Sequence, residues 1–224
     1  VAHDFNNALS PIMGFSEMLL NHPEMLDDRE RVMHYLQTVN IAARDAANVV
    51  RHLREFYRPR EANENFQPVD LNQLVGGTIS LTQPKWKNQA QAKGIPICLK
   101  KDLQPIPLIA GVEAELREVL TNLIFNSVDS MPDGGTITLR TCTEGKHVTL
   151  EVIDTGMGMT EDVRQRCLEP FFSTKGEGGT GLGLAMVYGI IQRHSGTIAI
   201  ESELGVGTTV RILLPLPKGR EAID

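Results

Sequence analysis

The positions of apolar residues divide the chain into two parts with different periodicities. Residues 1 to about 58 predict a helix, a turn and a second helix. In the second helix, apolar or small residues recur at alternating steps of four and three for more than three heptads, which is the pattern of a packed helical seam. These positions are Val32, Leu36, Val39, Ala43, Ala46, Val50, Leu53 and Tyr57.

The first helix also gathers its apolar residues on one face, although Ser16 interrupts it. This face consists of Phe5, Leu9, Ile12 and Leu19. Two antiparallel helices that each carry one apolar seam cannot bury both seams by themselves. We therefore expect two chains to associate into a four-helix bundle, which makes the protein a homodimer.

Polar segments bound the second helix on both sides. Segment 21–28 contains Pro23 and breaks the first helix, and Asp27 or Asp28 can cap the second one. Segment 58–65 is polar, ends the second helix and is typical of a linker.

From Phe66 onward, short alternating runs mix with helical runs. Asp70 is expected to cap a helix that ends near Gln83. Helical patterns also cover residues 113–130 and 182–194. Alternation and turn residues predict strands over 95–100, 136–142, 147–153, 197–202 and 208–214. This order predicts an α+β sandwich, in which helices back a mixed or antiparallel sheet.

Composition narrows the classes of function. The chain has 224 residues, which suffices for one large or two small domains, and 41% of them are hydrophobic. A net charge of -6 argues against a general nucleic-acid binder. There is no run of 18 apolar residues and no secretory signal, so we expect no membrane contact by this sequence. Three dispersed cysteines, Cys98, Cys142 and Cys167, are typical of reduced thiols in a cytosolic protein.

The helix expected over residues 113–130 carries an unusual polar stripe. Glu118, Asn122 and Asn126 recur every four residues, opposite an apolar face. Asparagine forms helices poorly, so two on one face need a reason. A neutral amide oxygen can bind Mg²⁺ while phosphates supply the negative charge. A solvated helix face is the alternative interpretation.

A carboxylate and two glycines follow the strand expected over residues 147–153. Asp154 can accept a hydrogen bond from an exocyclic amine such as adenine N6. Gly156 and Gly158 would let the backbone approach a flat base closely. An ordinary turn is the alternative interpretation of this Asp-x-Gly-x-Gly segment.

Segment 169–183 contains five glycines and no helical or strand pattern, which is typical of a mobile lid. Its glycine amides lead into the helix expected from Leu182, whose N-terminus favours phosphate oxygens. Lys175 can add a positive charge, and Phe171 and Phe172 would anchor the lid to the core. The segment matches neither a Walker A loop nor a Rossmann fingerprint.

Taken in order along the chain, these motifs resemble those of the sensor histidine kinases of two-component systems. Residues 122–126, 154–159, 169–175 and 179–184 look like the N, G1, F and G2 boxes of that family. The segment 205–209 is also similar, and the resemblance places Thr208 near the carboxylate that binds adenine. His3-Asp-Phe-Asn-Asn7 resembles the H box that accepts the phosphoryl group, in the variant common among hybrid kinases.

The resemblance covers essentially the whole chain and implies two domains. Residues 1–60 would form the dimerisation and histidine phosphotransfer domain. Residues 66–218 would form a catalytic ATP-binding domain with the Bergerat (GHKL-type) α/β sandwich fold. The implied cofactors are ATP and Mg²⁺. The implied nucleotide-binding residues are Asn122, Asn126, which is also the Mg²⁺ ligand, Asp154, Gly156, Gly158, Lys175, Gly179, Thr180, Gly181, Leu182, Gly183 and Thr208.

Helix geometry agrees with His3 as the phosphoacceptor. At about 100° per residue, His3 lies roughly 160° from the mean direction of the apolar face of its helix and so faces solvent. Asp4 can orient the imidazole and accept its proton while the other ring nitrogen attacks the γ-phosphate. Asn7 lies one turn further along the same face. The other five histidines are interpreted as structural or surface residues.

The expected function is ATP-dependent autophosphorylation of His3, followed by transfer to an aspartate in the receiver domain of a response regulator. In the family, the residue at the position of Asn7 is implied to place a water for dephosphorylating that regulator. The expected location is cytoplasmic, and the full-length protein can still be membrane-anchored. The alternatives are a GHKL-type ATPase, which would carry a glutamate where this chain has Asn122, and a non-catalytic phosphotransfer scaffold.

Overall fold

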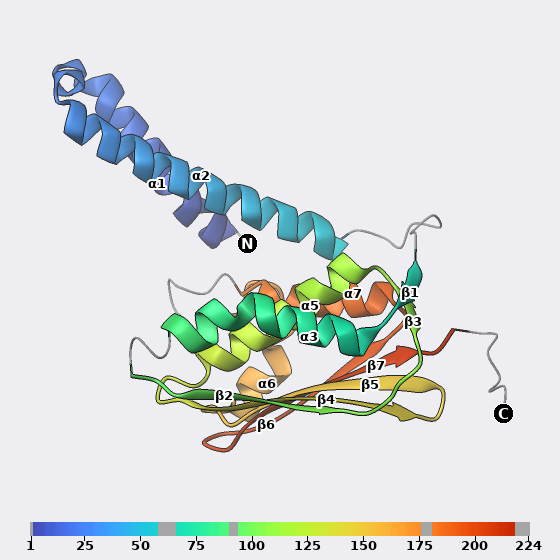
Figure 1. Cartoon of the computed structure of the whole chain (residues 1–224). Coiled ribbons are helices and arrows are strands. Elements are labelled where there is room, and N and C mark those ends of the chain that lie inside the picture. Colours follow the sequence, from blue (N-terminus) through green and yellow to red (C-terminus); the bar gives the residue numbers. More distant parts are fainter. Residues whose placement is uncertain (1, 58–65, 90–93, 176–180, 218–224) are drawn as a thin grey trace. The chain divides into compact units, whose positions relative to one another are not determined.

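A computed structural model of the chain describes residues 2–57, 66–89, 94–175 and 181–217 (Figure 1). The chain divides into two compact units, which are described separately. The helical unit contains the N-terminal helices and also residues 170–182, and the α/β unit contains residues 59–169 and 183–224. Within the described ranges, none of the helices is long and apolar enough to pass through a lipid bilayer.

The helical unit contains the predicted helix, turn and helix. The two helices are α1 (Ala2–Asn21) and α2 (Arg29–Tyr57), and the turn between them is the short 3-10 helix η1 (Pro23–Asp27). Asp28 caps α2, because its Oδ1 accepts the backbone N–H of Arg31 at 3.1 Å. Of the two capping residues considered, Asp28 is therefore the one used.

The helices α1 and α2 pack on a stripe next to the predicted heptad seam. The Phe15 and Tyr35 rings stack with centroids 4.9 Å apart, and Tyr35 and Ala42 are buried. The heptad positions Leu36 and Ala43 are exposed in the single chain. Of the heptad residues Ala46 is buried, and Phe15 was missing from the face predicted for α1. The association of two chains through the heptad seam stays a prediction. Tyr35 lies outside the heptad pattern, yet its ring is large enough to fill the helix contact.

The α/β unit is built on a five-stranded sheet with strand order β2-β4-β5-β7-β6. In this sheet β2 and β4 pair in parallel and the other neighbouring strands pair antiparallel, so of the two predicted forms, mixed or antiparallel, the sheet is the mixed one. The strands are β2 (Ile97–Leu103), β4 (Gly135–Glu144), β5 (His147–Asp154), β6 (Thr197–Glu203) and β7 (Gly207–Pro215).

Three helices lie on one face of this sheet (Figure 1). They are α3 (Leu71–Gln83), α5 (Glu113–Asp129) and α7 (Gly183–Arg193), each close to its predicted range. Asp70 caps α3 as predicted, since its Oδ1 accepts the backbone N–H of Gln73 at 3.0 Å.

Smaller elements complete the unit. Pro84–Gln89 (η2) extends α3 as a wider π-helical turn, and α6 (Glu161–Arg166) is a short helix beside β6. The strands β1 (Gln67–Val69) and β3 (Ile109–Gly111) pair antiparallel in a separate two-stranded sheet.

Strand alternation decides which residues of β5 reach the core. Val148, Leu150 and Val152 are buried in the same apolar cluster as Leu120 and Ile124 of α5. Successive side chains of a strand point to opposite faces. Asp154 therefore shares the helix-covered face with Val152.

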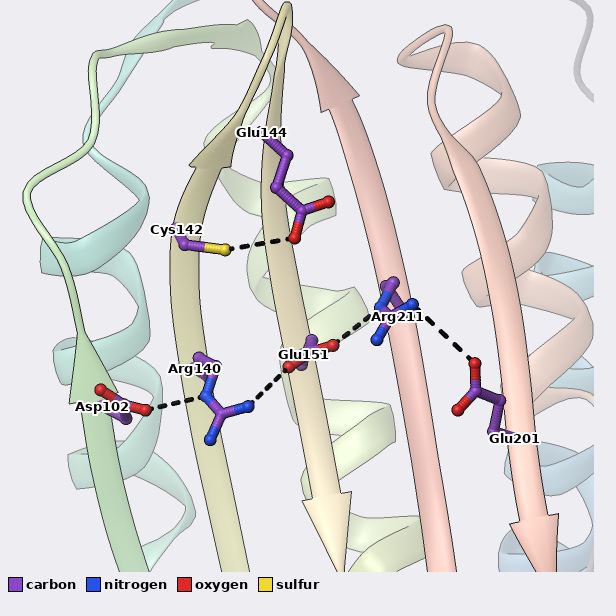
Figure 2. Close-up of polar contacts among 7 residues, drawn as sticks. All are labelled: Asp102, Arg140, Cys142, Glu144, Glu151, Glu201 and Arg211. Carbon is purple, nitrogen blue, oxygen red and sulfur yellow. Dashed lines mark hydrogen bonds and ion pairs between the residues drawn. The ribbon is translucent and has the colours of Figure 1, made fainter.

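The opposite face of the sheet carries a row of charges, with one residue from each of the five strands (Figure 2). Arg140 lies 2.8 Å from Asp102 and 3.3 Å from Glu151. Arg211 lies 2.7 Å from Glu151 and 3.8 Å from Glu201. The signs alternate along the row, so each charge neighbours an opposite one. Cys98, Cys142 and Cys167 form no disulfide in this structure.

Candidate functional site

The polar stripe on α5 faces the beginning of α7. Asn122 Nδ2 donates to the backbone oxygen of Glu118 at 2.9 Å, which commits the amide nitrogen to the helix itself. A Cβ added at Gly183 would lie 3.2 Å from Asn122 Oδ1 and 3.8 Å from Asn126 Nδ2. Gly183, the first residue of α7, therefore lies against both asparagines. The opposite face of α5 is buried in the core.

Asp154, at the end of β5, is a buried acceptor, and its side chain is held by two donors. The residue is 7% exposed. Its Oδ2 accepts the Ser127 hydroxyl at 3.1 Å, and its Oδ1 accepts the backbone N–H of Gly156 at 2.9 Å. Burial raises the pKa of this carboxyl, and the hydrogen bonds from Gly156 and Ser127 act in the opposite direction.

Ser127 was not predicted as a site residue. It lies on the buried face of α5, directly after Asn126. A polar residue at an apolar position of the helical pattern was the signal that could have indicated it. Its partner depends on which strand ends beside it, and the pattern of one helix does not contain that information.

Thr208 lies where the resemblance implied. It is the residue opposite Asp154 in the pairing of β5 with β7. Its hydroxyl is 2.8 Å from the hydroxyl of Ser202, and a hydrogen bond from its backbone tends to lower the pKa of Asp154. Thr208 therefore supports the carboxylate through the main chain.

The first glycine stretch is pressed against the protein itself. A Cβ at Gly156 would overlap the side chain and carbonyl of Ser130. Gly158 has φ +65°, and a Cβ there would overlap the carbonyl of Glu203. The expected reason for these glycines was close approach to a base. In this structure the groups that approach them closely are the end of α5 and the β6–β7 turn.

The second glycine stretch is described only in part, because Gly179 and Thr180 lie outside the described residues. Gly181 has φ +62°, and its carbonyl accepts the Phe171 N–H at 2.9 Å. The two ends of the candidate lid therefore meet at its base. Lys175 is exposed, and the buried Leu182 precedes Gly183, the first residue of α7.

The residues at the start of the chain are helical, as expected. His3, Asp4 and Asn7 belong to α1, but the described part of the structure does not include their side chains. The role of His3 as phosphoacceptor therefore stays a prediction.

The residues of the α/β unit fit a nucleotide with bound Mg²⁺. Neutral amides and a helix N-terminus suit phosphates and a metal. The buried acceptor Asp154 suits an amine donor of a base. All of these groups lie on the helix-covered side of one unit.

Two family models match the chain. The model described as "Histidine kinase-, DNA gyrase B-, and HSP90-like ATPase" matches residues 111–218, and the "His Kinase A (phospho-acceptor) domain" matches residues 1–62.

Curated relatives match nearly all of the chain. "Sensor kinase CckA" of Brucella abortus is 38% identical over 236 aligned residues, which cover 96% of this chain and 23% of that protein. "Sensor histidine kinase ZraS" of Klebsiella oxytoca is 35% identical, with 96% of this chain and 45% of that protein covered. The chain thus spans about a quarter to a half of the length of these relatives.

Solved structures share the fold. Full-length ShkA in complex with AMPPNP is 27% identical with a TM-score of 0.68, over 83% of this chain and 39% of that one. The catalytic domain of the histidine kinase ThkA is 25% identical with a TM-score of 0.57, over 68% of this chain and 96% of that one.

Proposed function

The chain belongs to the sensor histidine kinases, and on that premise we propose that it transfers the γ-phosphoryl group of Mg-ATP to His3. The phosphoryl group then passes to an aspartate in the receiver domain of a response regulator. The observation that carries the proposal is the grouping of a buried carboxylate, Asp154, two asparagines and the N-terminus of α7 in one unit.

Each nucleotide-binding group has a distinct role in the proposal. Asp154 accepts a hydrogen bond from adenine N6. The hydrogen bonds that it accepts from Ser127 and Gly156 keep the carboxylate oriented. The first amides of α7 and Lys175 balance the phosphate charge. Asn126 would hold Mg²⁺, which would neutralise charge on the phosphates.

The transfer step joins an imidazole nitrogen of His3 to the γ-phosphorus and breaks the bond to the oxygen of ADP. The proton on the other ring nitrogen passes to Asp4. Asn7 places a water for the reverse task, hydrolysis of the regulator's phosphoaspartate. The same dimer would then act as kinase and as regulator phosphatase.

A hydrolytic GHKL ATPase is the less favoured alternative. Such an enzyme needs a general base where this chain has Asn122. An amide cannot take a proton from water, and the Asn122 amide nitrogen is already bonded to the Glu118 carbonyl. A water molecule at the nucleotide site therefore has no general base at position 122 to take its proton.

The proposed partners follow from the helical unit and the reaction. A second copy of the chain would cover the exposed apolar residues of α2 in a four-helix bundle. The ATP that the reaction consumes is an intracellular metabolite, so the proposed location of this part of the protein is cytoplasmic. The proposal involves no nucleic acid.

The direct test is incubation with Mg-ATP that carries a radiolabelled γ-phosphate. We expect acid-labile label on the wild type and none on His3→Ala, which should still bind ATP. His34→Ala, with a substitution at an exposed histidine of α2, serves as the matched control and should be labelled normally. Label on His3→Ala would overturn the assigned acceptor. Rapid release of phosphate without any phosphohistidine would instead support the ATPase alternative.

A further inference from the structure

A buried histidine, His194, joins the C-terminal end of α7 to the N-terminal end of α5. Asn122 and Asn126 lie toward the other end of this helix pair. His194 directly follows α7 and is 2% exposed. Its Nε2 accepts the backbone N–H of Val112 at 3.0 Å, and its Nδ1 lies 2.9 Å from the Ile190 carbonyl oxygen. A carbonyl can only accept and an N–H can only donate, so these partners select the neutral ring with its proton on Nδ1.

Val112 gives this hydrogen bond its importance. It is the N-cap residue of α5, and it provides no side-chain cap. The first N–H groups of a helix lack partners within the helix. The imidazole of His194 therefore supplies from α7 an acceptor that α5 does not supply for itself. Gly111 makes room for the ring, because a Cβ there would lie 3.0 Å from His194 Cδ2.

An ion pair joins the same two helix ends. Arg193 Nη2 lies 3.1 Å from Glu115 Oε1, and both side chains are largely buried. The Phe66 ring stacks on the imidazole of His194, with the two ring centroids 4.8 Å apart. We refer to Val112, Glu115, Arg193 and His194 as the α5–α7 contact.

The α5–α7 contact and the candidate site lie at opposite ends of one antiparallel helix pair. The start of α5 meets the end of α7 at this contact, whereas Asn122 and Asn126 meet Gly183 at the start of α7. About 15 Å of regular helix separates the two ends of α7. Apolar packing between the helices is not directional, whereas a hydrogen bond and an ion pair specify register.

We propose that His194 is a positioning residue for the nucleotide, because its bond to Val112 sets the register of α7 against α5 and hence the distance between the α7 amides and the two asparagines. This inference rests on the proposed function in taking Mg-ATP as the ligand. A shift of about 1 Å at a reacting group is enough to lower activity severely.

Two substitutions at His194 separate its two hydrogen bonds. His194→Gln retains an oxygen near the position of Nε2, which can accept the Val112 N–H. His194→Asn retains a donor near Nδ1 for the Ile190 carbonyl but has no acceptor that reaches Val112. We expect His194→Asn to weaken calorimetric binding of a non-hydrolysable ATP analogue with Mg²⁺ by about three- to tenfold. We expect His194→Gln to restore most of that affinity.

A stability control distinguishes positioning from folding. Ile212→Val removes one buried methylene from β7, which contributes no residue to the α5–α7 contact, and should lower the thermal midpoint while nucleotide affinity stays at the wild-type value. Hydrogen exchange of the Val112 amide supplies an independent readout. It should be slow in the wild type and in His194→Gln, and fast in His194→Asn.

The outcomes separate the two hypotheses. A folded wild type that binds no Mg-nucleotide would sink the proposed function and leave nothing for His194 to position. If the wild type binds but both variants bind equally well, or equally poorly, the inference is overturned while the proposed function stands. Should His194→Asn fail to fold, Gly111→Ala takes its place and should weaken binding in the same way. Its Cβ would lie 3.0 Å from His194 Cδ2 and 2.9 Å from Leu116 Cδ1, and Ile212→Val controls for the disturbed apolar packing.

Discussion

At the scale of single residues, the buried position of Asp154 suits hydrogen bonding to a nucleotide base but lowers the stability of the folded domain. Burial is the largest influence on this carboxyl and raises its pKa above the ordinary value of 3.8. A carboxyl with a raised pKa contributes its full stability below the pKa of the unfolded chain and loses it as the pH rises through the folded pKa. At neutral pH the ionised Asp154 therefore destabilises the folded domain.

Asp154→Asn should consequently raise the thermal midpoint at pH 7, because an amide does not ionise. It should also weaken ATP binding by about tenfold or more, because a charged acceptor is replaced by a neutral one. The difference in midpoint between variant and wild type should shrink as the pH falls and the wild-type carboxyl takes up a proton. Melting curves at several pH values check this, together with nucleotide titrations. A variant that is less stable than the wild type at pH 7 would show that the hydrogen bonds outweigh burial.

The sequence predicted the candidate site residues by type but not by their contacts. Asp154 and Asn126 were recognisable because their motifs occur in the order that resembles the sensor histidine kinases. Taken alone, each also fitted an ordinary turn or a solvated helix face. The bond from Ser127 to Asp154 joins residues 27 positions apart, and only the packing of α5 on β5 brings them together. The need for Gly158 likewise depends on where the Glu203 carbonyl lies.

At the scale of elements, the row of charges shown in Figure 2 connects the five strands on the face of the sheet opposite the helices. Glu151 stands at its centre, with a side chain only 8% exposed, between Arg140 and Arg211. A largely buried carboxylate is acceptable only while its partners remain. The row therefore connects neighbouring strands through side chains, in addition to the main-chain hydrogen bonds.

Glu151→Gln should lower the free energy of unfolding by about 1–3 kcal/mol, because two arginines lose their shared carboxylate. Asp102→Asn is the matched control at the edge of the row, where the side chain is 52% exposed and the expected loss is below about 1 kcal/mol. Urea unfolding of both variants measures the difference. Equal losses would mean that the central position has no special importance.

Among the elements, length and context decided what the sequence could predict. Strands such as β5 were found because they alternate for eight residues, whereas β1 and β3 have three residues each and were missed. The strand that corresponds to β2 was predicted over residues 95–100, and in the structure it begins at Ile97. Parallel pairing with β4 extends it to Leu103, and that pairing partner lies more than 30 residues further along the chain.

At the scale of the whole molecule, the helical unit presents apolar surface that a single chain leaves open. Leu36 is 50% exposed, and Met33 and Ile41 are exposed on the same helix. Scattered exposed apolar residues are ordinary, but a series along one long helix is typical of an interface. The heptad pattern predicted an association between chains. Within one chain, Tyr35 and Ala42 lie outside that pattern and are buried together with the heptad residue Ala46.

Leu36→Glu should therefore disrupt the proposed dimer. A charge at the centre of a four-helix bundle loses its hydration without gaining a partner, so the dissociation constant should rise by at least about tenfold. Light scattering during size-exclusion chromatography over a range of concentrations measures it. Gln37→Glu adds the same charge at the next, exposed position and should remain dimeric. If the two variants dissociate alike, Leu36 is not part of the interface.

Helix α5 has one face in the core of its unit, through Leu120 and Ile124, and carries Asn122 and Asn126 on the other. Unfolding this helix destroys the candidate site, so a nucleotide that binds there binds the folded domain alone. At a ligand concentration 100 times the Kd, such binding adds about 2.7 kcal/mol to the free energy of unfolding. The energy charge of a cell would then influence the lifetime of the protein as well as its activity, because proteases act on the unfolded fraction.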